Sequence, residues 1–114
     1  MGPKKEEKRK FARVKDQCPV SYSIIPQGKT RRKMTLDLSQ GGLRFISDHF
    51  IPLHSNLKIE IKLKDIPKAI SAIIKPIWIK EIFDDERYEL GAEFVHINSE
   101  DLKFLKDYFR LHSD

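Results

Sequence analysis

The chain has 114 residues, of which 39% are apolar, and this is enough for one domain with a modest core. No apolar run approaches the roughly 20 residues that span a bilayer, and the first residues lack the apolar stretch of a secretory signal. We therefore expect a cytoplasmic protein without membrane insertion. The lone Cys18 excludes an internal disulfide and a zinc site built from several cysteines.

The positive charge is concentrated at the N-terminus. Residues 1–15 hold seven Lys or Arg and two Glu, a net charge of +5, whereas residues 16–114 hold fifteen charges of each sign. The sequence therefore predicts a mobile basic arm over 1–15 and a near-neutral domain over 16–114. A basic arm indicates an anionic partner, although a solvated tail without a partner would look the same.

Alternating apolar and polar residues predict three strands in the first half of the chain. They cover 18–24, 30–36 and 43–46, with turns at 26–28 and 37–42. In the first strand the apolar positions begin at Cys18, which we expect to pack as a small hydrophobic residue. In the second strand, Met34 and Leu36 share one face.

The second half of the chain begins with the clearest half-buried strand, over 57–63, where isoleucine and leucine alternate with exposed lysine and glutamate. A longer strand follows over 69–79, with Trp78 in step with its apolar residues. Pro76 lacks a backbone donor, so it should lie at an edge or a bulge. An acidic turn at 84–86 leads to a last strand over 88–96.

The C-terminal segment predicts a helix. Asn98 can cap it, while Glu100 and Asp101 suit the positive end of the helix dipole. An apolar stripe follows at helical spacing, formed by Leu102, Leu105, Tyr108 and Phe109. About six short strands and one helix predict a mainly β protein, a small antiparallel barrel that the helix plugs or flanks.

Arg9 and Arg13 form an R-x-x-x-R pair in the basic arm. Each guanidinium presents a rigid fork of donors that matches phosphate oxygens or the edge of guanine, and its flat face can stack on a base. Two such groups on an arm could hold a small anionic ligand from two sides. Among 22 basic residues such a pair alone carries little weight.

Residues 37–42 form a D-x-S-x-x-G motif between two predicted strands. The simple interpretation is turn chemistry, in which Asp37 and Ser39 bond their own backbone while Gly41 and Gly42 supply positive φ angles. The functional interpretation is that Asp37 accepts from guanine N–H groups or braces an arginine, and Ser39 binds a base edge. Gly42 would then let a ligand approach the backbone.

The order of these features resembles the PilZ domain family of bacterial cyclic di-GMP receptors. Basic arm, R-x-x-x-R, strands, D-x-S-x-x-G, further strands and a C-terminal helix match over roughly residues 8–110. Trp78 in a late strand and the segment Leu90-Gly91-Ala92-Glu93-Phe94 add to the resemblance. It implies a six-stranded antiparallel β-barrel with a C-terminal α-helix, and a non-catalytic receptor that relays cyclic di-GMP binding to a downstream protein.

The resemblance also assigns the site residues. Arg9 and Arg13 would hold phosphates and guanines, and Asp37, Ser39 and Gly42 would form the base-recognising side. Lys8 stands where the family often has a third arginine, which bears on whether one or two ligands bind. Further candidates near the ligand are Lys10, Gly41 and Gly91.

Other functions fit the sequence less well. The four histidines have no spacing suited to a metal site, and Ser39 has no evident partner base, so neither a metal, a cofactor nor catalysis is expected. A PilZ-like interaction module without nucleotide remains an alternative. Binding of a nucleic-acid polymer is a weaker alternative, because the body of the chain is near neutral. We expect a monomer or a weak dimer.

Overall fold

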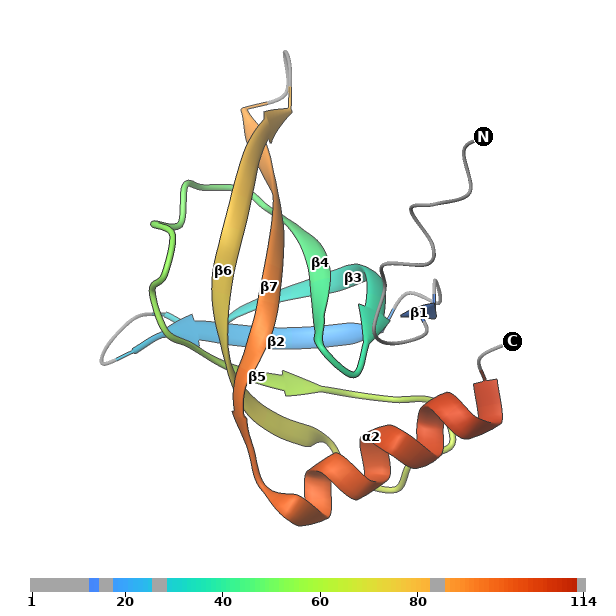
Figure 1. Cartoon of the computed structure of the whole chain (residues 1–114). Coiled ribbons are helices and arrows are strands. Elements are labelled where there is room, and N and C mark those ends of the chain that lie inside the picture. Colours follow the sequence, from blue (N-terminus) through green and yellow to red (C-terminus); the bar gives the residue numbers. More distant parts are fainter. Residues whose placement is uncertain (1–12, 15–17, 26–28, 83–85, 113–114) are drawn as a thin grey trace, which may run out of the picture.

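The computed structural model describes residues 13–14, 18–25, 29–82 and 86–112. Its elements in chain order are β1 (Arg13–Val14), β2 (Pro19–Ile24), β3 (Arg31–Ser39), β4 (Gly42–Ser47), β5 (Leu57–Ile61), β6 (Ile70–Ile82), β7 (Arg87–Ile97) and α2 (Ser99–His112) (Figure 1). The predicted turn at 26–28 and most of the acidic turn at 84–86 lie outside the described residues.

Six of these strands form a closed antiparallel barrel. Its strand order is β3-β2-β5-β6-β7-β4, and β4 pairs again with β3 to close the ring. The short β1 is added beside β3. Closure leaves the six main strands without an open edge. The prediction of a six-stranded barrel with a C-terminal helix is confirmed.

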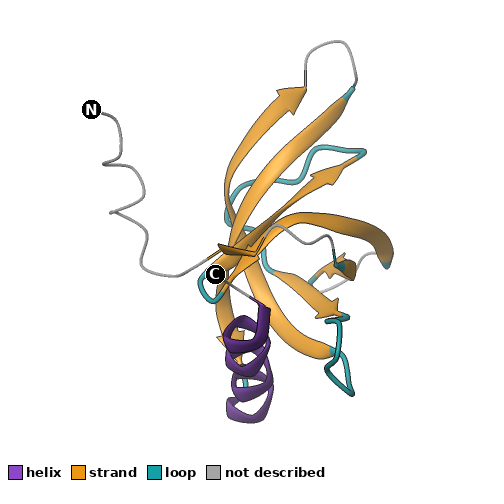
Figure 2. Cartoon of the chain, turned by 90° about the vertical axis from the view of Figure 1, so that its right-hand side faces the viewer, coloured by secondary structure: helices purple, strands orange, loops and turns teal. Residues whose placement is uncertain are grey.

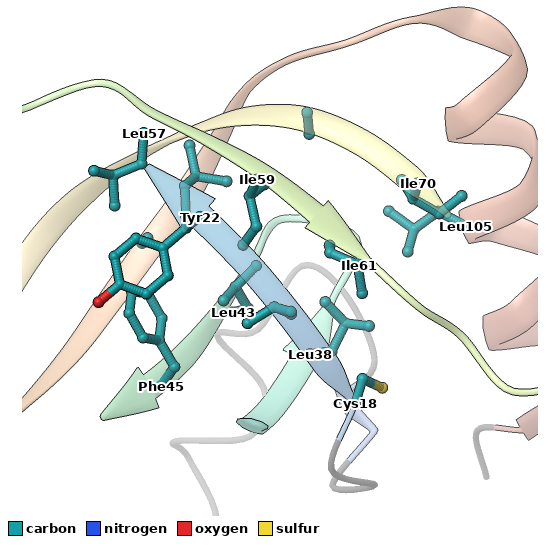
Figure 3. Packing of buried hydrophobic residues seen from close by; sticks show 14 of the residues in the cluster. Cys18, Tyr22, Leu38, Leu43, Phe45, Leu57, Ile59, Ile61, Ile70 and Leu105 are labelled. Carbon is teal, nitrogen blue, oxygen red and sulfur yellow. The ribbon is translucent and has the colours of Figure 1, made fainter. Parts of the chain in front are cut away.

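The barrel interior is filled by the inward side chains of all six strands (Figure 3). In β5 the buried and exposed residues alternate without exception, as predicted, although the strand ends at Ile61 and not at residue 63. Cys18 is buried as expected, with its sulfur 3.9 Å from the hydroxyl of Tyr108 on the helix. The core therefore joins the first strands to the last element of the chain.

The helix α2 lies at one end of the barrel (Figure 2). The side chain of Asn98 caps it by accepting from the Asp101 backbone N–H at 2.8 Å, which confirms the predicted start. Leu105, Tyr108 and Phe109 of the predicted stripe are buried. Asp101 is also buried, and one of its carboxylate oxygens accepts from the backbone N–H of Ser71 on β6 at 3.1 Å.

A β-bulge in β3 changes which way its side chains face. Thr35 pairs with the core residue Phe45, and Asp37 pairs with Arg44, so Leu36 is the extra residue. Strict alternation would turn Asp37 inward like Thr35. The bulge instead places Asp37 on the outer face beside the partly exposed Arg44, which is a known use of bulges near functional sites.

A second bulge lies in β6. Pro76 pairs with Ala92 and Trp78 pairs with Gly91, so Ile77 is the extra residue. Pro76 therefore lies at a bulge, as its missing donor predicted. The prediction that Trp78 continues the inward face of Ile70, Ala72 and Ile74 is wrong, because the bulge shifts the alternation and leaves Trp78 38% exposed.

Met34 and Leu36 also differ from the packing that their apolar character suggests. Met34 is exposed, Leu36 is half-buried, and the buried residues of this part of β3 are Thr35, Asp37 and Leu38. The Thr35 hydroxyl accepts from the Cys18 backbone N–H at 2.9 Å, so a polar residue is satisfied inside the barrel.

Candidate functional site

The D-x-S-x-x-G motif is not a turn over its whole length. Asp37 and Ser39 belong to β3, Gly42 begins β4, and only Gln40 and Gly41 form the connection. The expectation of a turn over 37–42 is wrong because β3 keeps its pairing with β4 through Leu38. Asp37 and Ser39 are therefore held by a sheet, which positions side chains more rigidly than a loop does.

Ser39 organises the tight connection. Its hydroxyl accepts from the Gly41 backbone N–H at 3.1 Å and lies 3.4 Å from the Gly42 carbonyl, to which it donates. The Gly41 carbonyl in turn accepts from the Phe94 backbone N–H at 2.9 Å. The expected bonding of Ser39 to its local backbone is confirmed, and the connection is anchored to β7.

Gly42 is required for packing against the neighbouring strand. A Cβ atom at this position would lie 2.0 Å from the Ala92 carbonyl oxygen of β7. The expectation that Gly41 and Gly42 supply positive φ angles is wrong, since no glycine among the described residues has a positive φ. The glycine is needed because two strands approach closely, as happens where a strand glycine marks close backbone contact.

The second arginine of the R-x-x-x-R pair lies next to this motif. In the antiparallel pairing of β1 and β3, Arg13 is opposite Ser39, and Val14 is opposite Leu38. Arg13 and Asp37 are 24 residues apart in sequence, and the strands that carry them are paired neighbours in the fold. The other candidates of the arm, Lys8, Arg9 and Lys10, lie outside the described residues.

Arg44 makes ion pairs with two acidic side chains, from β3 and from β7. Its Nε donates to Oδ2 of Asp37 at 2.8 Å, and its Nη1 donates to Glu89. The side chains of Asp37, Glu89 and Arg44 are 4%, 16% and 35% exposed. Burial lowers the pKa of the Arg44 guanidinium, but bonds and attraction to Asp37 and Glu89 outweigh it and raise that pKa above its ordinary value.

The D-x-S-x-x-G motif allows Asp37 to brace an arginine but does not identify which one. The signal for Arg44 was present in the hairpin, because two strands joined by a short connection place residues 37 and 44 opposite each other. Glu89 comes from β7, and the pairing of β4 with β7 cannot be read from local sequence. Three strands thus contribute to one charged cluster.

Gly91 is on β7 between Arg44 and Trp78 in the strand register. A Cβ atom on Gly91 would lie 2.1 Å from Nε1 of Trp78, so the indole occupies the space above this glycine. Asp37, Arg44, Gly91 and Trp78 are successive partners across β3, β4, β7 and β6, and directly paired residues share a face of the sheet. They therefore form one row on the outer face.

Chemically, this outer face is suited to binding. It offers a carboxylate, a hydroxyl, an arginine and two glycines beside a strand that begins at Arg13. Among the described residues no group of three or more His, Cys, Asp or Glu side chains could hold a metal ion. In the same part of the chain no helix is long and apolar enough to cross a membrane.

A second surface feature lies away from this row. A cavity of about 330 Å³ opens on the outer face of β2, between β3 and β5. Its walls combine apolar and charged side chains, mostly basic, and include Pro19, Arg32, Met34, Glu60 and Lys62. Its described lining residues include none of the D-x-S-x-x-G motif.

Comparison with known proteins places these features in context. The family model described as "PilZ domain" matches residues 7–111. No curated protein matches the chain.

Three solved structures have the same fold. The inhibitor of motility MotI/DgrA from Bacillus subtilis has a TM-score of 0.74 at 18% identity, over 91% of this chain and 50% of MotI. The PilZ domain of YcgR from Escherichia coli, with c-di-GMP, has a TM-score of 0.68 at 18% identity over 91% of both chains. The MrkH–c-di-GMP complex from K. pneumonia has a TM-score of 0.71 at 15% identity, over 88% of this chain and 50% of MrkH. The present chain thus spans half the length of MotI and of MrkH.

Proposed function

The chain belongs to the PilZ domain family, and on this premise we propose that it is a non-catalytic receptor for cyclic di-GMP that relays binding to a protein partner. Two proteins of similar fold, YcgR and MrkH, are seen with this ligand. Both motifs that the resemblance ties to the ligand are complete in this chain. The R-x-x-x-R motif consists of Arg9 and Arg13, and the D-x-S-x-x-G motif consists of Asp37, Ser39 and Gly42.

The observation that carries the proposal is the pairing of Arg13 with Ser39. It brings the basic arm to the end of β3, where Asp37 and Ser39 lie on the same face of the sheet with their side chains largely buried. A ligand on this face can be contacted from the arm and from the barrel together. Such an arrangement suits a molecule that carries phosphates and base edges.

In this proposal Arg9 and Arg13 supply the cationic side of the site. Their guanidinium groups bind the phosphate oxygens and stack on the guanines of the ligand. Lys8 and Lys10 add positive charge beside them, and Lys8 influences whether one or two ligands are held. Ligand binding draws Arg9 and Arg13 against the segment from Asp37 to Gly42 and orders residues 5–15, and the resulting surface is what a partner protein recognises.

Asp37 and Ser39 supply the base-recognising side. A carboxylate accepts from the N–H donors of guanine, and adenine lacks the same donor pattern. A site built to bond those donors rejects an analogue without them. Gly41 and Gly42 contribute backbone rather than side chains at the connection, so a ligand can approach it closely. Gly91 lies further along the same row and is covered by the indole of Trp78.

The proposal is tested by calorimetric titration of arginine variants with cyclic di-GMP. A hydrogen bond to a charged group contributes about 1.5–3 kcal/mol, so Arg9→Ala and Arg13→Ala should each weaken binding roughly tenfold or more. Arg32→Ala, which removes an exposed arginine from β3 on the side of β2, serves as the matched control. Equal affinity of Arg13→Ala and Arg32→Ala would rule out the phosphate role of Arg13.

One observation favours a second function, an interaction module that binds no nucleotide. The cavity on β2 has apolar and charged walls, and its described lining contains none of the residues of the D-x-S-x-x-G motif. A partner protein could dock there whether or not a ligand is bound. Absence of cyclic di-GMP binding together with partner capture that Met34→Asp abolishes would favour this function.

A further inference from the structure

We propose that Arg44 is a positioning residue of the cyclic di-GMP site, which aims the Asp37 carboxylate at guanine and offsets its negative charge. Glu89 holds Arg44 from the opposite strand. This inference rests on the proposed function, because it concerns the same ligand. It adds two residues, Arg44 and Glu89, that neither sequence motif contains.

The geometry connects Arg44 directly to Asp37. The bulge at Leu36 turns Asp37 to the outer face, where Arg44 is its partner in the strand register. Nε of Arg44 is 2.8 Å from Oδ2 of Asp37, which is the distance of a strong charge-assisted bond. Because the Asp37 side chain is almost fully buried, this bond is protected from water and restricts the carboxylate to one orientation.

Glu89 makes the orientation of Arg44 specific. It receives a bond from Nη1, while Asp37 receives one from Nε, so the planar guanidinium is held at two of its edges. Lysine could not replace this arrangement, because its ammonium is a point charge without a fixed fork. The pairing of β4 with β7 places Glu89 opposite Ile46, two residues along the strand from Arg44.

The bond from Arg44 is compatible with ligand recognition. A carboxylate has about four acceptor positions, and Arg44 Nε uses one of them on Oδ2. Guanine presents neighbouring N–H donors, and a carboxylate can accept from such donors while it keeps the bond from an arginine. Arg44 therefore supports Asp37 without taking over its function.

Charge gives Arg44 a second effect on the same ligand. Asp37 and Glu89 are two acidic groups at a site proposed to receive a molecule with two phosphates. Arg44 lies between them and is itself 35% exposed, so it offsets part of their negative field where the ligand would bind. Without it, two carboxylates would repel the phosphates.

The test is a double-mutant cycle, read by calorimetric titration of the full chain with cyclic di-GMP and with cyclic di-AMP. The variants are Asp37→Asn, Arg44→Gln and the double variant. We expect each single change to weaken cyclic di-GMP binding roughly tenfold, and the double change to weaken it by about the same factor, because both remove one coupled unit. The preference for cyclic di-GMP over cyclic di-AMP should fall in all three.

Two further variants separate positioning from stability. Arg44→Lys keeps the charge, and should restore only part of the affinity and little of the base preference. Lys33→Gln, which breaks the Lys33–Asp48 ion pair elsewhere on β3, should leave both unchanged. Thermal melting of each variant shows that it is folded.

Each outcome decides between the ideas. If the unmodified chain binds cyclic di-GMP and Arg44→Gln binds it with the same affinity, the inference is overturned and the proposed function stands. The same holds if the two single losses of affinity add to roughly a hundredfold in the double variant. A folded chain that does not bind cyclic di-GMP would overturn both.

Discussion

Arg13 lies directly opposite Ser39 in the antiparallel pairing of β1 with β3. This pairing joins the end of the basic arm to the last residue of the strand that also carries Asp37. Neither motif could form the proposed site alone, because one provides cations and the other provides acceptors on a rigid sheet. The fold therefore brings Arg13 to the end of the strand that carries Asp37 and Ser39.

Gly42 and Gly91 should respond differently to substitution. A Cβ atom on Gly42 meets backbone of β7, whereas one on Gly91 meets the indole of Trp78. Backbone in a closed barrel cannot move aside easily, so Gly42→Ala should lower the free energy of unfolding by about 1–3 kcal/mol, the usual cost of overpacking. Gly91→Ala should cost less, because a partly exposed side chain can rotate. Chemical denaturation of both variants measures the difference.

The role of the indole can be isolated by repeating the second substitution in a Trp78→Ala background. There the space above Gly91 is empty, and Gly91→Ala should become close to neutral. A cost that stays the same with and without Trp78 would contradict the packing explanation.

Asp101 should matter for stability far more than its neighbour Glu100. Asp101 is buried and accepts from Ser71 N–H, and the ammonium of Lys68 is 3.2 Å from its other oxygen. The side chain of Glu100 is 68% exposed and lies 3.5 Å from the same ammonium. We expect Asp101→Ala to lower the unfolding free energy by about 1.5–3 kcal/mol and Glu100→Ala by less than about 0.5 kcal/mol. Similar losses from urea denaturation would show that burial of Asp101 does not hold α2 to β6.

His49 should make the fold less stable at mildly acidic pH. Burial, and next the positive charge of Arg31, lower the pKa of His49 below its ordinary value of 6.5. A lowered pKa means that the folded state binds the proton less readily than the unfolded state. The contribution of neutral His49 to the stability of the folded state is therefore complete above about pH 6.5. It is lost as the pH falls through the pKa of His49 in the folded state.

The measurement is thermal unfolding of the unmodified chain and of His49→Gln between about pH 7.5 and about pH 5. The variant should lose less stability over this range than the unmodified chain, since glutamine does not titrate. A parallel decline in the two proteins would show that His49 contributes nothing to the acid sensitivity.

Regular elements with one buried face could be predicted from the sequence. In β5 every second residue is buried, and α2 begins at the cap that Asn98 provides. The bulges at Leu36 and Ile77 could not be predicted in this way, because one inserted residue reverses the inward and outward positions after it. The errors at Trp78 and in the assumed turn over 37–42 have the same cause. In both places, pairing with another strand, and not the local sequence pattern, determines which way a side chain faces or where a strand ends.

The candidate site was predicted only in part for the same reason. Sequence motifs identified Asp37, Ser39 and Gly42, and the structure shows how β3 and β4 hold them. Arg44 and Glu89 belong to no motif, and their contact depends on β7 meeting β4. The reason for Gly42 also came from β7, since it is a close backbone approach and not a turn conformation.

The most direct test of the account is calorimetric titration of the full chain with cyclic di-GMP, and separately with GTP and cyclic di-AMP as control ligands. We expect saturable binding of cyclic di-GMP with a stoichiometry of one or two per chain, and much weaker binding of the other two nucleotides. A cooperatively folded protein that gives no binding heat and no shift in melting temperature with cyclic di-GMP would contradict the central claim.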